Sequence, residues 1–301
     1  MRSSNVFIAE VALLFVAFFW GTNPAAIKIG LLFMPVMVFN TLRILVGLVV
    51  AWVAVLWTKT YRPLDKEDLM KIVMISVFGF SAFQYLLVVG AQYTAAGNVS
   101  LILALLPISV ALINRLWHNE KIAAVNGLGI GVSLGGVILI IVGSGKELSL
   151  ASDHLIGTCY ILLAQGVFGY YTVFSKGLLQ KYSTYYITVC VLTVTVLLFL
   201  PFVIADLPHI RWSEIPLSAW LSMAFSGIFP LCVANFLWIW GAGQLGSTKA
   251  SLYNNIGPVF AVIAGYVLLG EGFGMLQFLG AVVIFVGLYF TRLKPSLSRS
   301  N

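Results

Sequence analysis

The segment AGNVSL at residues 96–101 decides the fold, because the chain contains a second version of it. The second version, STKASL, stands at residues 247–252, which is 151 positions later. A proline and a glutamate follow each version at the same distances: Pro107 and Glu120 in the first half, Pro258 and Glu271 in the second. Apolar units of helical length that repeat over half a chain are typical of membrane transporters built from two homologous bundles.

The start of each half repeats at a slightly different offset. Trp20-Gly21 corresponds to Phe168-Gly169, and Lys28 corresponds to Lys176, in each case 148 positions on. The difference of three residues from the offset of 151 predicts a length change between the first and third helices of each half.

Composition places most of the chain inside a membrane. Sixty per cent of the 301 residues are hydrophobic and 9% are charged, whereas a soluble domain carries about 25% charged residues. Ten apolar spans, each close to the ~20 residues that cross a bilayer as helix, lie at 6–27, 36–57, 69–90, 95–116, 124–143, 155–178, 183–204, 217–240, 248–269 and 273–291. We therefore predict an all-α integral membrane protein with ten transmembrane helices, in two five-helix repeats at residues 1–146 and 153–294.

Five crossings per repeat have a mechanical consequence. An odd number means that the second repeat enters the membrane from the opposite side, so the two repeats should be related by a pseudo-twofold axis in the membrane plane. Inverted repeats of this kind can exchange conformations, which offers alternating access to a site between them near the midplane.

The distribution of the basic residues predicts the orientation. If the N-terminus is cytoplasmic, 13 of the 17 Lys and Arg residues fall at or near inner helix ends, and only Lys146 and Arg211 fall in outer loops. The positive-inside rule then predicts two cytoplasmic termini and, for a bacterial protein, the inner membrane. Because the net charge of +7 follows topology, we expect a lipid environment and no nucleic-acid partner.

The order of the motifs resembles the EamA-type members of the drug/metabolite transporter superfamily. Trp20-Gly21-Thr22-Asn23-Pro24 leading to Lys28 is similar to that family's opening motif, and Arg43 to its second-helix arginine. The proline-to-glutamate helix occurs in both halves. The second half departs from the pattern, because Phe168 and Val191 replace Trp20 and Arg43.

The resemblance implies a carrier for small polar or amphipathic metabolites, often an exporter of amino acids or related compounds. It also implies a central cavity built by helices of both halves, with the fifth and tenth helices at the periphery. Substrate identity, transport direction, coupling ion and oligomeric state stay open.

Polar and aromatic residues inside the spans are the candidates for the cavity wall. Polar groups are costly in hydrocarbon, so they should face partners, a cavity or the interface. The candidates are Trp20, Asn23, Gln84, Tyr85, Asn98, Gln165, Tyr170, Asn235, Trp238, Tyr253 and Asn254. The alternatives are hydrogen bonds between helices, worth about 0.6 kcal/mol each, and aromatic belts at the interfaces.

Two charged residues are candidates for gating or coupling. Arg43 lies about two turns from the outer end of the second helix, where it could snorkel outward or bind a carboxylate; a structural or gating anchor is the favoured interpretation over a direct ligand. Glu10 lies near the inner end of the first helix, where it could couple transport to protons or be solvated as a cap. Glu271 should cap a helix or pair with a basic residue.

Other residues argue against catalysis. The acidic residues are scattered, and the three histidines are expected in loops, so we expect no enzyme, no cofactor and no metal site. A channel-like or regulatory membrane protein is the alternative to a carrier, and an intramembrane enzyme is less favoured. Gly127, Gly131 and Gly135 form a stripe that predicts close helix packing within the fold, with dimerisation as the alternative.

Overall fold

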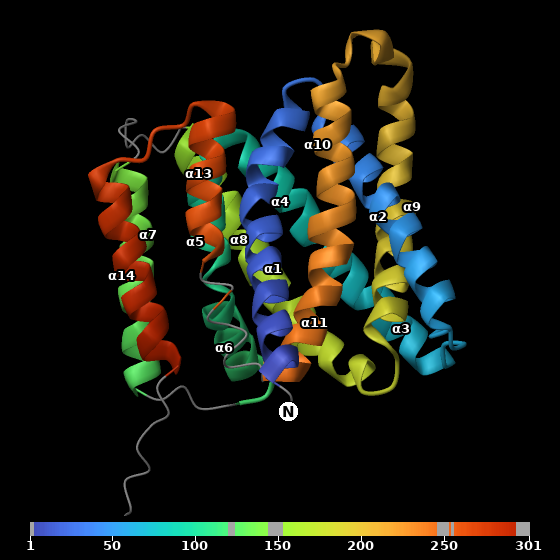
Figure 1. Ribbon diagram of the computed structural model, residues 1–301, viewed down its shortest axis with the longest axis horizontal. Helices are drawn as coiled ribbons and strands as arrows, with labels where there is room; N and C mark the ends of the chain where they lie inside the picture. Colours follow the sequence, from blue (N-terminus) through green and yellow to red (C-terminus); the bar gives the residue numbers. More distant parts are fainter. Residues whose placement is uncertain (1–2, 120–123, 144–152, 246–252, 254–255, 293–301) are drawn as a thin grey trace, which may run out of the picture.

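The structure is a computed structural model, which describes residues 3–119, 124–143, 153–245, 253 and 256–292 (Figure 1). Every regular element in these residues is helical, and none is a strand. The first half contains α1 (Ser3–Leu31), α2 (Val36–Thr58), α3 (Lys66–Ile75), the π-helical segment η1 (Ser76–Ser81), α4 (Ala82–Tyr93), α5 (Ala96–Leu103), α6 (Leu106–Trp117) and α7 (Ala124–Gly143). The second half contains α8 (Asp153–Leu179), α9 (Thr184–Asp206), the short 3₁₀ turns η2 (Leu207–His209) and η3 (Trp212–Glu214), α10 (Leu217–Ile228), the π-helical segment η4 (Phe229–Val233), α11 (Ala234–Leu245), α13 (Gly257–Leu269) and α14 (Met275–Arg292).

Seven helices are long and apolar enough to cross a bilayer, which confirms an all-helical protein of membrane type. They are Val6–Leu31, Val36–Thr58, Lys66–Tyr93, Ala124–Gly143, Asp153–Leu179, Thr184–His209 and Leu217–Gly241. The predicted fourth span is the pair α5 and α6, which bends by 41°. At the predicted ninth and tenth spans stand the shorter apolar helices α13 and α14. Part of the ninth span, at 246–252 and 254–255, lies outside the described residues.

The helices form an upright bundle whose two ends can be told apart. The helix α1 begins and α14 ends at the same end of the bundle, the lower one in Figure 1. We call this end the N-side and the other end the opposite side. The turns between α1 and α2, between α9 and α10, and between α13 and α14 lie on the opposite side.

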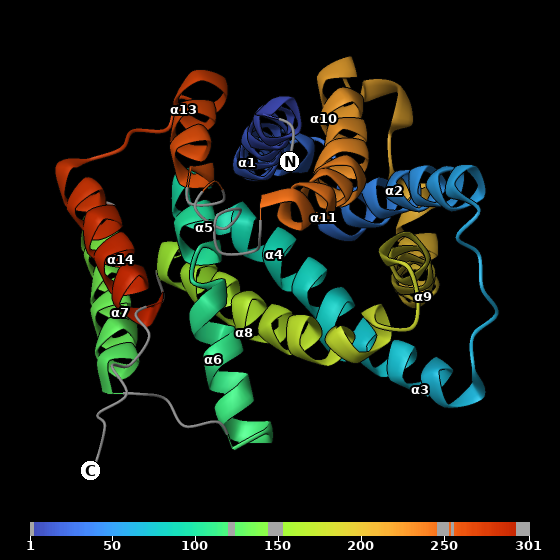
Figure 2. The ribbon, with the colours of Figure 1, turned by 60° about the horizontal axis from the view of Figure 1, so that its bottom comes forward.

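Packing divides the bundle into groups that mix the two halves of the sequence. In Figure 2, α1 runs beside α10, α11 and α13, while α8 crosses α4, α5 and α6. The helix α2 packs on α9, and α7 packs on α14 at one edge of the bundle (Figure 1). Segments far apart in sequence therefore supply each other's buried faces.

Two kinds of helix interruption recur at matched positions. The break between α5 and α6 comes just before Pro107, whose ring removes a backbone N–H and disfavours a continuous helix. Pro258 stands at the start of α13 in the same way. The π-helical segments η1 and η4 interrupt the third and eighth spans, and adding 151 to the bounds of η1 gives 227–232, which overlaps η4. The sequence did not predict these segments.

Close helix crossings depend on glycine at matched positions. A Cβ on Gly21 would lie 2.3 Å from the Gly257 carbonyl oxygen and 2.9 Å from the Phe260 Cβ. The matching residue, Gly169, would place a Cβ 2.7 Å from the Cβ of Ser109. These distances are too short for any side chain, so glycine sets the separation of α1 from α13 and of α8 from α6.

The prediction for the glycine stripe was wrong. A Cβ built on Gly127, Gly131 or Gly135 meets no atom within 4 Å, so this face of α7 has no neighbour in the described part of the fold. Instead, Gly136 and Gly280 make the contact between α7 and α14, because a Cβ on either would lie within 3 Å of the other's carbonyl oxygen. The helix carries glycine on two faces, and α14 covers only one of them.

On the N-side, one buried carboxylate joins the two halves. Asp68 in α3 has 1% of its side chain exposed and forms ion pairs with Lys71, at 2.9 Å, and with Lys181, at 2.8 Å, which precedes α9. The Tyr182 hydroxyl donates to the same carboxylate at 3.3 Å. The hydrogen bond that Lys181 donates to Asp68 raises the pKa of Lys181 above its ordinary value.

Candidate functional site

Arg43 lies in the interior of the bundle, fully buried at 0% exposure. Its guanidinium donates three hydrogen bonds: from Nε to Asn40 Oδ1 at 3.0 Å, from Nη1 to Ser226 Oγ at 3.2 Å, and from Nη2 to Gln84 Oε1 at 2.7 Å. The side chain does not snorkel to the surface, so that alternative does not apply. Its acceptors come from α2, α10 and α4 and hold it across the bundle.

Further hydrogen bonds extend this set to α1. The Ser226 hydroxyl donates to Asn23 Oδ1 at 2.6 Å, and Asn40 Nδ2 donates to the Gln84 carbonyl oxygen at 3.2 Å. We call the five residues Asn23, Asn40, Arg43, Gln84 and Ser226 the Arg43 cluster. It joins α1, α2 and α4 of the first half to α10 of the second half.

Small residues allow α10 to reach Arg43. A Cβ on Gly227 would lie 2.4 Å from the Arg43 carbonyl oxygen, and one on Gly47 would lie 3.1 Å from the Gly227 carbonyl oxygen. The two helix backbones therefore approach closely at this level. Ser226, next to Gly227, then has its short side chain within reach of the guanidinium.

The charge of Arg43 has no counter-ion among the described residues. The four ion pairs in the described part of the chain do not include it, and its acceptors are amide and hydroxyl oxygens. Three of the five N–H groups of the guanidinium are bonded in this way. A buried cation held only by neutral groups costs several kcal/mol relative to water, which an anionic ligand would offset.

Two tryptophans lie where the eighth span is interrupted. Trp20 donates from Nε1 to the Pro230 carbonyl oxygen at 3.0 Å, and Pro230 belongs to the π-helical segment η4. The rings of Trp20 and Trp238 have centroids 5.6 Å apart. A π turn leaves carbonyl groups without helical donors, and here one of them fixes the orientation of Trp20.

The matching position in the second half carries a reduced version of the cluster. Asn235 Nδ2 donates to Thr188 Oγ1 at 3.5 Å. These two residues correspond, at offsets of 151 and 148, to Gln84 and Asn40. The arginine position is Val191, so the second half keeps the polar contact between neighbouring helices without the charge.

Asn98 belongs to a separate buried network on the opposite side. Gln277 Nε2 donates to Asn98 Oδ1 at 3.1 Å, and Asn98 Nδ2 lies 3.4 Å from His154 Nε2. His154 Nδ1 lies 3.1 Å from Thr94 Oγ1. The expectation that His154 lies in a loop was wrong: it is 4% exposed in the first turn of α8.

An ion pair adjoins this network and connects the two halves. The Lys28 ammonium pairs with Glu271 Oε1 and donates to the Thr94 carbonyl oxygen at 2.9 Å. Glu271 Oε2 accepts from the Ala96 backbone N–H at 2.8 Å, at the start of α5. The predicted roles of Glu271, pairing and capping, are both confirmed. We call Lys28, Thr94, Ala96 and Glu271 the Lys28 junction.

Of the remaining candidates, Gln165 and Tyr170 lie in α8 and Glu10 lies in α1. Gln165 is 2% exposed, and neither its Nε2 nor its Oε1 has a hydrogen-bond partner in the described structure. Tyr170 stacks on Phe174 with centroids 4.6 Å apart. Glu10 is half-buried in α1, 13 residues and so about 20 Å from Asn23.

Three further predicted residues complete the set. Tyr253 is half-buried, and Asn254 lies outside the described residues. Tyr85 is 42% exposed and lines a surface cavity on the opposite side, although it follows Gln84 directly. Adjacent residues on a helix point about 100° apart, so Gln84 and Tyr85 have different surroundings.

Sequence reasoning missed Asn40, Ser226 and Gln277. Asn40 could have been found, because it stands one helical turn before Arg43 and faces the same way. Ser226 and Gln277 carry no local signal, since each meets its partner across more than 170 positions. Among the described residues, no group of three or more His, Cys, Asp or Glu side chains could hold a metal ion.

Comparison with known proteins gives a consistent result. The model of the EamA-like transporter family matches residues 7–142 and 155–293. The chain is 26% identical to "Uncharacterized transporter YoaV" of Bacillus subtilis, over 91% of this chain and 93% of that protein. It is 27% identical to a "Probable terminal-alkyne amino-acid exporter" of Streptantibioticus cattleyicolor, over 84% of this chain and 82% of the other.

Two more similarities cover almost the whole chain. A "Probable amino-acid metabolite efflux pump" of Salmonella typhimurium is 26% identical over 92% of each chain. A solved crystal structure superposes with a TM-score of 0.64 at 16% identity and covers 97% of each chain. At that identity the structural match supports the fold alone.

Proposed function

Because the chain belongs to the EamA-like transporter family, we propose that it is a secondary carrier that exports a small amino-acid-like metabolite across the bacterial inner membrane. The transporter role follows from the family and from relatives that are named transporters. Export and the amino-acid class are supported by the names of two relatives, an amino-acid exporter and an amino-acid metabolite efflux pump.

We propose that the carrier works by alternating access between two inverted five-helix repeats, at residues 1–146 and 153–294. The two separate family matches, 7–142 and 155–293, support this division. The matched helix interruptions at η1 and η4, and the matched crossings at Gly21 and Gly169, support a repeated architecture. With 13 of the 17 basic residues at one set of helix ends, we assign the N-side to the cytoplasm.

The buried charge of Arg43 is the observation that carries the substrate class. A guanidinium offers parallel N–H groups that fit a carboxylate in a bidentate arrangement. Arg43 has no ion-pair partner in the described chain, and it donates hydrogen bonds to residues of both halves. A substrate carboxylate would neutralise the charge of Arg43. Because the acceptors of Arg43 lie on α2, α4 and α10, movement of α10 relative to the other two helices would change the surroundings of the guanidinium.

The test is labelled exchange in proteoliposomes that hold a mixed pool of amino acids, with variants of Arg43. We expect saturable exchange for compounds with a free carboxylate. Two charge-assisted hydrogen bonds at about 1.5 kcal/mol each correspond to roughly 100-fold weaker apparent affinity in Arg43→Gln. Arg43→Lys keeps the charge without the fork and should lose about tenfold.

Arg211→Gln is the matched control, because Arg211 is 79% exposed and pairs with Glu214 at the surface. Its exchange should equal that of the wild type. Amines or amides that lack the carboxylate should be handled equally by the wild type and by a folded Arg43→Gln protein. A folded Arg43→Gln protein that keeps the wild-type preference for carboxylates would contradict the proposal, and non-saturating flux would favour a pore.

A further inference from the structure

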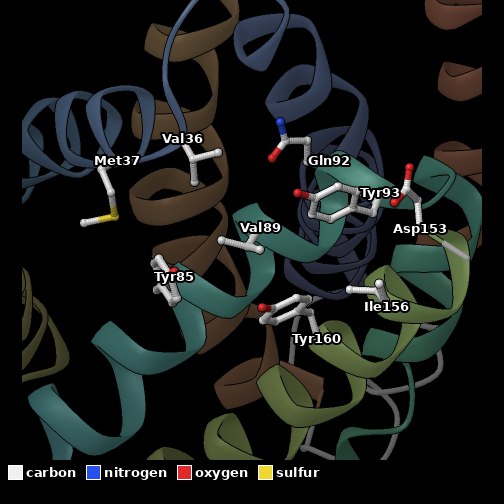
Figure 3. Close-up of a pocket in the computed structure, with 9 residues that line it drawn as sticks. All are labelled: Val36, Met37, Tyr85, Val89, Gln92, Tyr93, Asp153, Ile156 and Tyr160. Carbon is white, nitrogen blue, oxygen red and sulfur yellow. The ribbon is translucent and has the colours of Figure 1, made fainter. Parts of the chain in front are cut away.

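A cavity lies on the opposite side of the bundle, and no residue of the Arg43 cluster lines it. Polar groups in its wall have no partner among the described residues. The cavity volume is about 400 Å³, and α2, α4 and α8 form its walls (Figure 3). The lining residues are Val36, Met37, Tyr85, Val89, Gln92, Tyr93, Asp153, Ile156 and Tyr160. Three tyrosines and one carboxylate therefore share one small space.

Helix packing fixes the position of this space. A Cβ on Gly157 would lie 2.8 Å from the Tyr93 Cβ and 3.0 Å from the Gly90 carbonyl oxygen, so α8 and α4 are in close contact there. Tyr160 stands three residues after Gly157, on a neighbouring helical face. Figure 3 shows Tyr93 beside Asp153, Tyr160 next to Ile156 and between Asp153 and Tyr85, and Met37 on the far side of the cavity from Asp153. The aromatic groups thus project from packed helices.

The tyrosines of this cavity differ from others in the bundle. Tyr61, Tyr170, Tyr182 and Tyr185 each pair with another aromatic ring. None of the ring pairs within the described residues includes Tyr85, Tyr93 or Tyr160. Their hydroxyl groups form no hydrogen bond with another described residue. Ring faces and hydroxyl groups are both left for a ligand.

The charge of the cavity selects the ligand. Among the described residues that line the cavity, Asp153 alone is charged, and it forms no ion pair with a described residue. An anion would meet this carboxylate and no base among the described lining residues, so the cavity does not favour one. A cation would meet the carboxylate and the negative faces of the tyrosine rings, which attract ammonium groups.

We propose that this cavity is a binding site for the ammonium group of an organic amine, with Asp153 as counter-ion and Tyr85, Tyr93 and Tyr160 as the aromatic wall. The site lies where α4 ends and α8 begins, and the end of a membrane-spanning helix lies close to the headgroup region. A soluble amine and an amine-bearing lipid headgroup offer the same chemistry. The proposal is independent of the substrate carboxylate at Arg43.

The experiment is a binding titration of the purified full chain in phosphatidylglycerol nanodiscs, which contain no amine lipid. The two probes are choline and its neutral isostere 3,3-dimethylbutanol. We expect choline to bind at least about tenfold more tightly than the isostere, and Asp153→Asn to remove the difference. Equal binding of the two probes by the wild type would overturn the proposal.

Two further variants separate the aromatic wall from general effects. Tyr160→Leu removes an aromatic ring from the wall and should bind choline several-fold more weakly than the wild type. Asp206→Asn removes a charge from the same side, at the end of α9 and outside the cavity. It should leave choline binding unchanged, and an equal loss in Asp206→Asn and Asp153→Asn would refute a specific site.

The source of the amine is decided by lipid composition. If phosphatidylethanolamine in the nanodiscs weakens choline binding several-fold, the headgroup competes for the cavity and lipid is the ligand. If it has no effect, the site takes soluble amines. Because these titrations need no transport, their result stands whether or not Arg43 binds a carboxylate.

Discussion

Lys28 and Lys176 hold matching positions in the two halves, 148 residues apart, but their surroundings differ. Lys28 is partly buried and forms the Lys28 junction with Glu271 and with the backbone before α5. Lys176 is exposed and forms no ion pair with a described residue. Glu120, which matches Glu271, lies outside the described residues. The comparison shows that similar sequence is used differently at the two ends of the bundle.

In the proposed transport cycle, the two lysines would exchange these environments. The Lys28 junction ties α1 to the turn after α13 on the opposite side. A carrier open to that side must break it and form the matching contact on the N-side. The substitutions predicted below test the difference between the two lysines. They are given in order from the largest expected effect to the smallest.

Glu271→Gln should have the largest effect. It removes the charge that faces the Lys28 ammonium and weakens the acceptor for the Ala96 N–H. The cost of a partly buried charged partner is about 2 kcal/mol, which corresponds to a fall in Tm of roughly 4–8 °C. Thermal unfolding in detergent checks this, and exchange should fall about tenfold. An unchanged Tm would show that the junction is not formed.

The exchanged pair Lys28→Glu with Glu271→Lys should recover about half of that loss. Attraction between the two side chains returns, but a lysine at position 271 cannot accept from the Ala96 N–H. Tm values of both single variants and the double variant complete the cycle. If the two losses simply add, Lys28 and Glu271 do not interact.

Lys181→Gln should reduce stability by less than Glu271→Gln does, because the side chain of Lys181 is 51% exposed in its pair with Asp68 and solvent screens such a pair. The pKa of Lys181 is raised above its ordinary value of 10.5. The contribution is therefore fully present below pH 10.5 and is lost as the pH rises further. The Tm difference between wild type and variant should stay constant from pH 6 to 9, and a decline within that range would contradict the assignment.

Lys176→Gln should have the smallest effect on stability, below about 0.5 kcal/mol, as expected for a surface substitution. The effect of Lys176→Gln on exchange shows whether Lys176 acts in transport as Lys28 does. A loss of exchange with an unchanged Tm would mean that Lys176 has a partner in another conformation. Unchanged exchange would mean that the two ends open and close by different contacts.

The sequence predicted where the helices lie along the chain better than which side of each helix packs against a neighbour. Repeats and apolar spans are visible locally, so the helices and the pairing of Glu271 followed from the pattern. The rotation of each helix is set by its neighbours. The sequence of α7 shows glycine on two faces but not that α14 covers Gly136 rather than Gly131.

The candidate site was predicted in part, for a similar reason. Arg43, Gln84 and Asn23 were chosen because polar groups are costly inside spans, and they meet in one cluster. Ser226 completes the cluster from the other half of the chain, and nothing near it in the sequence marks it. The π turn that presents the Pro230 carbonyl to Trp20 depends on tertiary contacts as well.

The burial of Arg43 also has a consequence for the synthesis of the chain and its insertion into the membrane. Ser226 is made 183 residues after Arg43, which takes a ribosome about 10–40 s at 5–20 residues per second. Throughout that interval the guanidinium in α2 lacks one of its acceptors, and an arginine in the centre of an inserting helix costs about 2.5–3.5 kcal/mol. Asn40 and Gln84 are made early enough to shield the charge during this wait.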